Sequence, residues 1–60
     1  MAKLTEKQQR FVEEYLVDLN ATQAAIRAGY SVKTADVQGS RMLRNVKVQS
    51  AIGEAMALRS

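Results

Sequence analysis

The sequence predicts an all-α fold, a four-helix domain built around a helix-turn-helix unit. Apolar side chains recur at helical spacing through the first 19 residues, and residues 20–45 hold two further pairs of helix start and stop signals. The 60 residues include no cysteine and no histidine, so neither a disulfide nor the usual zinc ligands can stabilise the fold. We therefore expect one small domain, over residues 1–60, that depends on packing alone.

The first helix is predicted over residues 5–18. Thr5 is a favourable N-cap, and Gln8 stands three residues later, where its side chain completes a capping box. Seven side chains share one face at helical spacing, and all but one are apolar: Leu4, Gln8, Phe11, Val12, Tyr15, Leu16 and Leu19. Phe11 and Tyr15 could form a platform on which bases stack, but their place in this stripe favours the core.

A second and a third helix are predicted over residues 21–28 and 32–44. Asn20 caps the second helix, Gly29 supplies the left-handed residue that ends it, and Ser31 caps the third. Two short helices joined by a three-residue turn with a glycine are typical of a helix-turn-helix unit. We expect these two helices to cross steeply.

The third helix has a face of small and apolar residues, predicted to be buried: Val32, Ala35, Gly39, Met42 and Leu43. Gly39 either lets the alanine-rich second helix approach closely or, with Ser40, breaks the third helix in two. Its place on the buried face favours close approach.

A fourth helix is predicted over residues 46–58, after Asn45, which stops the third helix and caps the fourth. It carries a narrow apolar stripe: Val48, Ala51, Ile52 and Ala55. Met56 and Leu58 leave this stripe, so we expect the helix to continue into a segment outside these 60 residues.

The exposed face of the third helix is the candidate DNA-binding surface. Cations near the ends of the second and fourth helices extend it, and its predicted members are Lys33, Thr34, Val37, Gln38, Arg41, Arg44, Lys47 and Arg27. Residues 1–20 hold three basic and four acidic side chains, whereas residues 21–60 hold six basic and two acidic. Positive charge concentrated in this way suits a surface that meets the phosphates of nucleic acid.

Simpler explanations remain open for the basic residues. Lys33, Arg41 and Arg44 could only keep a helix soluble, and Arg27 and Lys47 could complement helix dipoles instead of touching flanking phosphates.

Two further residues bear on base readout. Val37 could contact a thymine methyl group in the major groove, or it could be an ordinary exposed valine or one that touches a neighbouring subunit. Asp36 argues against a phosphate contact at its own position. It could pair with Lys33 or accept a hydrogen bond from a cytosine amino group.

The sequence offers no catalytic constellation, because it lacks histidine, cysteine and a G-x-x-x-x-G-K phosphate loop. We expect neither enzymatic activity nor a metal or other cofactor. No apolar run approaches the roughly 20 residues that a membrane-spanning helix needs, and nothing resembles a signal peptide. We therefore expect a soluble, intracellular protein with no membrane partner.

Five stretches carry a resemblance to a known family: LTEKQQRFVEEYL, NATQAAIRAGYS, KTA, GSRMLRN and KVQSAI. They resemble the N-terminal domain of the small terminase subunit of tailed double-stranded DNA phages, in particular phages of Bacillus-type hosts. The resemblance runs from Leu4 to about Ala55, and the run N-A-T-x-A-A-x-x-A-G-Y-S is quite specific. Val32 and Val46 depart from the family, which often has proline at the first helical residue.

The resemblance implies a helix-turn-helix domain that recognises the packaging start site on viral DNA in the host cytoplasm and initiates genome packaging. It also implies two protein partners: the large terminase subunit, which holds the ATPase and nuclease, and further copies of the chain, joined through an oligomerisation domain beyond residue 60. Two other functions stay open. A helix-turn-helix transcription regulator would use the same surface at a promoter, and a small helical adaptor would bind a protein through an apolar groove.

Overall fold

Four helices follow one another along the chain in the computed structural model, which describes residues 4–59 and contains no strand among them. The helices are α1 (Glu6–Asp18), α2 (Ala21–Arg27), α3 (Ala35–Arg44) and α4 (Val46–Arg59). The predicted all-α fold is confirmed. Residues 1–3 and 60 of the predicted domain lie outside the described residues.

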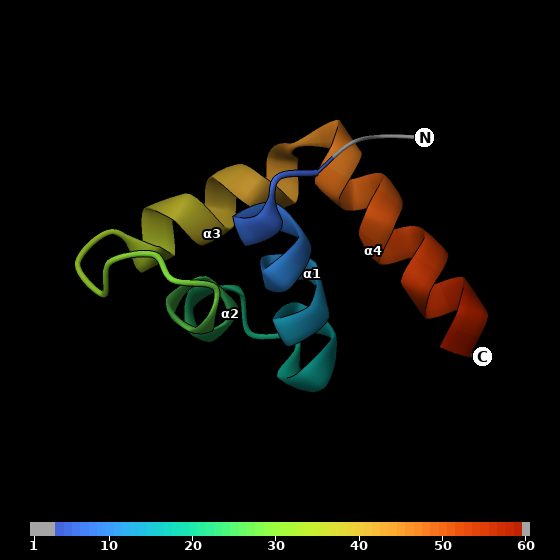
Figure 1. Ribbon diagram of the computed structural model, residues 1–60, viewed down its shortest axis with the longest axis horizontal. Helices are drawn as coiled ribbons and strands as arrows, with labels where there is room; N and C mark the ends of the chain where they lie inside the picture. The colour runs from blue at the N-terminus through green and yellow to red at the C-terminus, as the bar shows by residue number, and fades with distance from the viewer. Residues whose placement is uncertain (1–3, 60) are drawn as a thin grey trace.

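The other helices pack around α1, which lies near the centre of the domain (Figure 1). In this view α2 is seen nearly end-on below α3, and α4 descends on the other side of α1. α2 packs on both α1 and α3, and α4 also packs on both. The helix-turn-helix pair α2–α3 is therefore supported by α1 and α4.

The start of α1 is fixed locally, as predicted. The Thr5 hydroxyl accepts a hydrogen bond from the Gln8 N–H, and the Gln8 side chain accepts one from the Thr5 N–H, both at 3.1 Å. Phe11 is fully buried, and its ring stacks on that of Tyr15 with 5.8 Å between centroids. This burial confirms the core prediction for Phe11 and excludes it as a platform for bases.

Leu19 does not belong to the apolar stripe, contrary to the prediction. Its backbone is left-handed with a φ of +57°, and its N–H donates to the Tyr15 carbonyl at 2.7 Å, which ends α1. Its side chain is 59% exposed, because the chain reverses here toward α2. A left-handed leucine costs about 1–2 kcal/mol. Packing of the two helices, and not the preference of leucine, therefore sets this turn.

The core is small and apolar throughout the described residues. Its buried members are Phe11, Val12, Ala24, Ala25, Ala28, Ala35, Met42 and Val48. Half of these side chains are alanines, so the helices reach contact only by approaching one another closely.

α2 and α3 come closest at Gly39. A methyl group placed on Gly39 would lie 2.9 Å from the carbonyl oxygen of Ala21 and 3.2 Å from its Cβ. α3 runs unbroken through Gly39 and Ser40. The structure therefore confirms the predicted close approach and excludes a break in the helix.

The connection between α2 and α3 is longer than predicted, and α3 begins at Ala35, not at residue 32. Gly29 leaves α2 with a φ of +105°, as predicted. Ser31 does not cap α3; its carbonyl accepts from the Thr34 N–H at 3.0 Å, which forms a separate turn. Val32 lies in this turn and is 72% exposed, so the prediction that it is buried is wrong. Because α2 crosses the middle of α3, the chain needs these extra residues to reach the start of α3.

The remaining helix ends lie close to the predicted ones. α2 ends one residue early, with Ala28 as its C-cap. The Asn45 side chain accepts from the Lys47 N–H at 2.9 Å and so caps α4, as predicted. Along α4 only Val48 of the predicted stripe is fully buried, and Leu58 is 87% exposed.

We predict that Gly39→Ala lowers the free energy of unfolding by about 1–3 kcal/mol, because a new methyl group meets backbone atoms that cannot move aside. Gly53→Ala is the matched control, since a Cβ there meets nothing within 4 Å. In the control the better helix propensity of alanine should raise stability by up to about 1 kcal/mol. Urea unfolding followed by circular dichroism measures both variants. Equal gains in stability would contradict the close contact at Gly39.

Candidate nucleic-acid interface

Some of the described basic side chains have partners within the domain. Arg10 pairs with Glu14 at 3.2 Å on α1. Arg27 of α2 donates to Asp18 of α1 at 3.1 Å, and it also lies 3.9 Å from Glu14. The Arg27 pairs connect α2 to α1, and both arginines have a carboxylate partner.

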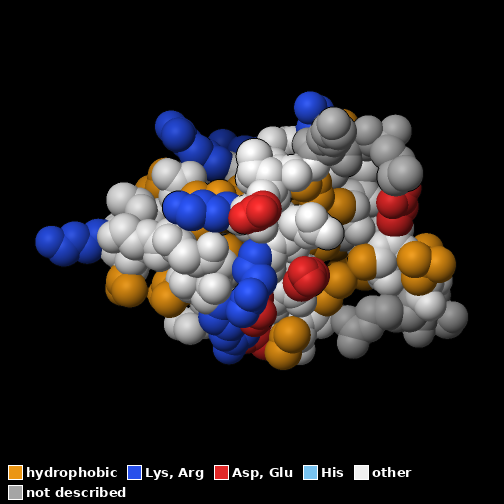
Figure 2. Space-filling model, in the orientation of Figure 1, with side chains coloured by type: hydrophobic (Ala, Val, Ile, Leu, Met, Phe, Trp, Pro, Cys, Tyr) orange, Lys and Arg blue, Asp and Glu red, His pale blue; other side chains and the backbone are white. Residues whose placement is uncertain are grey.

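A second group of basic side chains has no such partner among the described residues. No ion pair, side-chain hydrogen bond or ring contact with a described residue is made by the side chains of Lys33, Arg41, Arg44 and Lys47, all of which are exposed. Figure 2 shows Lys and Arg side chains along the upper edge, over α3 and the start of α4, with no acidic side chain among them in this view. At the lower centre, by contrast, basic and acidic side chains lie against one another.

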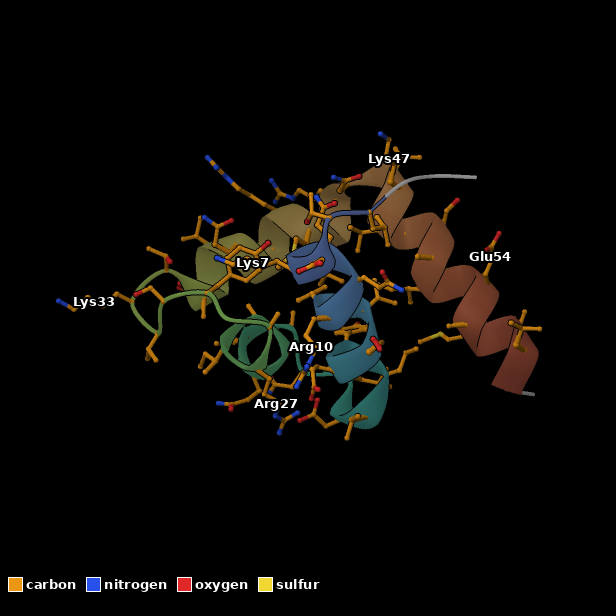
Figure 3. All side chains as sticks on the ribbon, in the orientation of Figure 1. Lys7, Arg10, Arg27, Lys33, Lys47 and Glu54 are labelled. Atoms are coloured by element: carbon orange, nitrogen blue, oxygen red, sulfur yellow. The ribbon has the colours of Figure 1, made fainter. Side chains whose placement is uncertain are left out.

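We define the α3 surface as the exposed residues of α3 and its two flanks: Lys33, Thr34, Asp36, Val37, Ser40, Arg41, Arg44 and Lys47. Lys33 comes from the turn before α3, and Lys47 from the first turn of α4. The two lysines lie at opposite ends of α3 (Figure 3). A ten-residue helix is about 15 Å long, so the free cations are spread along that length.

A shallow hollow of about 320 Å³ lies on the outward side of α3. Its lining consists of Asp36, Val37, Ser40, Arg41 and Arg44. Three of the predicted DNA-binding residues are thus brought together, and Val37 is 51% exposed beside the two arginines. An apolar side chain held between cations in an open hollow is suited to the edge of a base.

The other predicted residues are placed differently. Lys33 lies in the turn before α3, and Thr34 is the N-cap of α3, where its side chain makes no capping hydrogen bond. Contrary to the prediction, neither residue lies on the exposed face of the helix. Gln38 is half-buried on the flank of the helix. Arg27 lies on the α1 side of the domain near Arg10, away from Lys33 and Lys47 (Figure 3).

Lys7 is a basic residue that the sequence reasoning did not single out. Its ammonium group lies 5.1 Å from the centroid of the Tyr30 ring, a cation–π contact between α1 and the turn after α2. Nothing in the local sequence indicates this contact, because the two residues meet only when α1 packs on α2.

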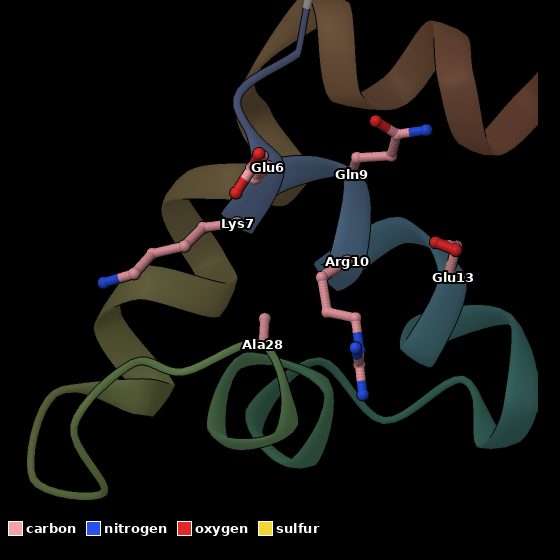
Figure 4. Close-up of a pocket in the computed structure, with 6 residues that line it drawn as sticks. All are labelled: Glu6, Lys7, Gln9, Arg10, Glu13 and Ala28. Carbon is pink, nitrogen blue, oxygen red and sulfur yellow. The ribbon is translucent and has the colours of Figure 1, made fainter.

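A second hollow, of about 330 Å³, lies beside α1 and the end of α2 (Figure 4). Its lining mixes charges of both signs: Glu6, Lys7, Gln9, Arg10, Glu13 and Ala28. Lys7 and Arg10 point in different directions, and Glu13 lies apart from both. These groups do not converge on a common point, so the hollow fits neither an anion nor a catalytic centre.

The described residues include no group of three or more acidic side chains placed to hold a metal ion. None of the helices in this part of the chain is long and apolar enough to cross a membrane. The expected absence of a cofactor stays a prediction.

The comparisons with known proteins all identify the same family. A family model described as the terminase small subunit matches residues 4–60. The terminase small subunit of Staphylococcus phage 80alpha is 50% identical over 54 residues, which cover 88% of this chain and 37% of that protein. The PBSX phage terminase small subunit of Bacillus subtilis (strain 168) is 50% identical over 50 residues, 83% of this chain and 19% of that protein. The terminase small subunit of Bacillus phage SPP1 is 43% identical over 56 residues, 92% of this chain and 38% of that protein. The chain therefore spans well under half the length of these relatives.

We predict that Val48→Ala and Val37→Ala differ sharply in their effect on stability, although both remove the same atoms. Val48 is fully buried between the helices, so its truncation should cost roughly 2–3 kcal/mol of unfolding free energy. Val37 is half exposed, and its truncation should change stability by no more than about 0.5 kcal/mol. Thermal or urea unfolding of the two variants measures the difference. A similar loss in both would mean that Val37 does not face outward.

Proposed function

The chain belongs to the terminase small subunit family, and from this premise we propose that it binds double-stranded DNA through the α3 surface during phage genome packaging. This proposal rests on one observation: some described basic side chains have carboxylate partners within the domain, and others do not. Within the described part of the chain, Arg10 and Arg27 are paired with carboxylates, whereas the four cations of the α3 surface have no partner.

Phosphate binding explains why these four cations are left without partners. Arg41 and Arg44 lie on neighbouring turns of α3, and like charges so placed destabilise a helix by a few tenths of a kcal/mol, so the arrangement is slightly unfavourable in the isolated domain. The phosphates of DNA reverse the sign of this effect, and they release condensed counterions on binding. The same arginines can instead bind guanine through its O6 and N7 atoms.

The shape of the domain supports α3 as the helix that enters DNA. The major groove is about 12 Å wide and admits one α-helix. α3 offers its outward face along its whole length, while α2 crosses behind it at Gly39. Lys33 and Lys47, at the two ends, would then reach phosphates that flank the groove. Arg27 is left out of the proposed interface because Asp18 already neutralises it.

The finer parts of the proposal rest on the family. We infer that the DNA site is the packaging initiation site, that the large terminase subunit is a partner and supplies the nuclease and ATPase, and that this domain itself is not an enzyme. The place of action would be the host cytoplasm. Association of copies would use residues beyond 60.

A transcription regulator remains the main alternative, since it would use the same surface at a promoter. Mapping the bound site on the phage genome separates the two functions. A protein-binding adaptor is less well supported. The hollow between α1 and α4, of about 280 Å³, includes Gln9 and Glu13 in its lining, so it is not an apolar groove.

We predict that Arg41→Ala and Arg44→Ala each weaken DNA binding, while Arg10→Ala, a matched removal of a paired cation, changes it little. Loss of a phosphate contact should weaken binding to all sequences alike and reduce the salt slope by about 1. With about four phosphates neutralised, the wild-type affinity should fall on the order of a hundredfold between 50 and 200 mM salt. Fluorescence anisotropy with a labelled duplex measures these effects. Binding that ignores salt, or equal losses in all three variants, would overturn the assignment.

We also predict that the 60-residue chain is largely monomeric and binds DNA with a Kd of roughly 10⁻⁴–10⁻⁶ M at physiological salt, the range of non-specific binding. Copies linked on a shared scaffold should bind phased sites about 10²–10⁴-fold more tightly. Sedimentation and DNA titration compare this chain with a full-length relative. A stable dimer of the 60-residue chain, or equal affinity of the two proteins, would refute this prediction.

A further inference from the structure

One carboxylate lies within the α3 surface. Asp36 lines the outward hollow with Val37, Arg41 and Arg44, and it is exposed. Among the described residues it is the single acidic side chain that lines the hollow. A carboxylate at this place repels phosphate, so it weakens general attraction to DNA.

Asp36 is held in position without being neutralised. One of its oxygens accepts a hydrogen bond from the Val37 N–H at 2.8 Å. Among the described residues it forms no ion pair, which removes the pairing with Lys33 that the sequence left open. Lys33 belongs to the preceding turn and extends away from the domain (Figure 3), because α3 does not begin until Ala35. Asp36 lines the hollow, and its second carboxylate oxygen is a hydrogen-bond acceptor without a partner among the described residues.

The major groove offers few donors to such an acceptor. Cytosine presents its N4 amino group, and adenine presents its N6 amino group beside the acceptor N7. An ionised carboxylate only accepts hydrogen bonds, so the acceptor N7 of adenine would repel a carboxylate that accepts from N6. Cytosine therefore matches the carboxylate better than any other base.

We propose that Asp36 is a specificity-determining residue, which accepts a hydrogen bond from the amino group of one cytosine in the major groove. This inference rests on the proposed function, because it needs α3 to lie in that groove. Asp36 is the second residue of α3, and in helix-turn-helix proteins the N-terminal residues of the recognition helix contact base edges. The arginines further along α3 supply general attraction, and Asp36 makes that attraction depend on sequence.

A purely structural role makes a different prediction. An acidic residue in the first turn stabilises a helix through its dipole, and Glu6 also lies in the first turn, that of α1. If Asp36 did only this, its loss would lower the affinity for every duplex in the same proportion. The pattern of base preference therefore separates the two roles, and Glu6 provides the matched control.

The test is selection from a pool of random 20-base-pair duplexes at 50 mM salt, followed by titration of selected and unselected duplexes. The proteins are wild type, Asp36→Ala, Asp36→Asn, Glu6→Ala and Glu6→Gln, each checked for helix content by circular dichroism. We expect the wild type to select cytosine at one position. Asp36→Ala should lose that preference, roughly five- to hundredfold, at this position only, and should bind unselected DNA at least as tightly. Asp36→Asn should shift the preference toward adenine, which asparagine binds through N6 and N7. Both Glu6 variants should keep the wild-type preference.

Two results would overturn the inference, and they are distinguishable. If the wild type binds DNA with a steep salt dependence but Asp36→Ala keeps the same base preferences, this inference alone fails. If the wild type binds no DNA, or binds it without salt dependence, the proposed function fails with it.

Discussion

The position of α3 depends on the contact between the backbone of Ala21 and the bare Cα of Gly39. Val37 and Arg41 stand two residues before and after this glycine, which places each about 160° around the helix axis from it. Pressing Gly39 against α2 therefore turns both side chains to solvent. The same contact that holds the helix-turn-helix pair together thus decides which residues of α3 face outward.

The alanine-rich core allows the close approach of α2 and α3, but it limits the apolar area that the core buries. Small side chains let the backbones of α2 and α3 come into contact, but each of them buries less apolar area than a large side chain would. Phe11 and Val48 are the largest fully buried side chains, and they come from α1 and α4. α1 and α4 therefore supply bulk to the core, while α2 and α3 supply a close crossing.

The described basic side chains also fall into two groups, those with a carboxylate partner and those without one. Arg10 of α1 and Arg27 of α2 are paired with carboxylates of α1, and the Arg27 pairs join the two helices. The described cations of α3 and its flanks have no such partners, and Asp36 lies among them without an ion pair. Long-range attraction and local selection can therefore be carried by different residues of one surface.

The sequence by itself determined the features that depend on neighbours within about four residues. The Thr5–Gln8 capping box, the Asn45 cap, the exit from α2 at Gly29 and the burial of Phe11 were all predictable, because caps and helical stripes are local patterns. The outward face formed by Val37, Arg41 and Arg44 also followed from helical periodicity.

Only the tertiary structure decided the features that join residues far apart in the chain. The left-handed turn at Leu19, the late start of α3 at Ala35 and the exposure of Val32 all follow from where α2 crosses its neighbours. The pairing of Arg27 with Asp18 is likewise decided by how α2 packs on α1, since the sequence gives each charge but not its distance from another. For that reason the sequence could propose a basic surface, while the fold had to show which of the described cations already have a carboxylate partner.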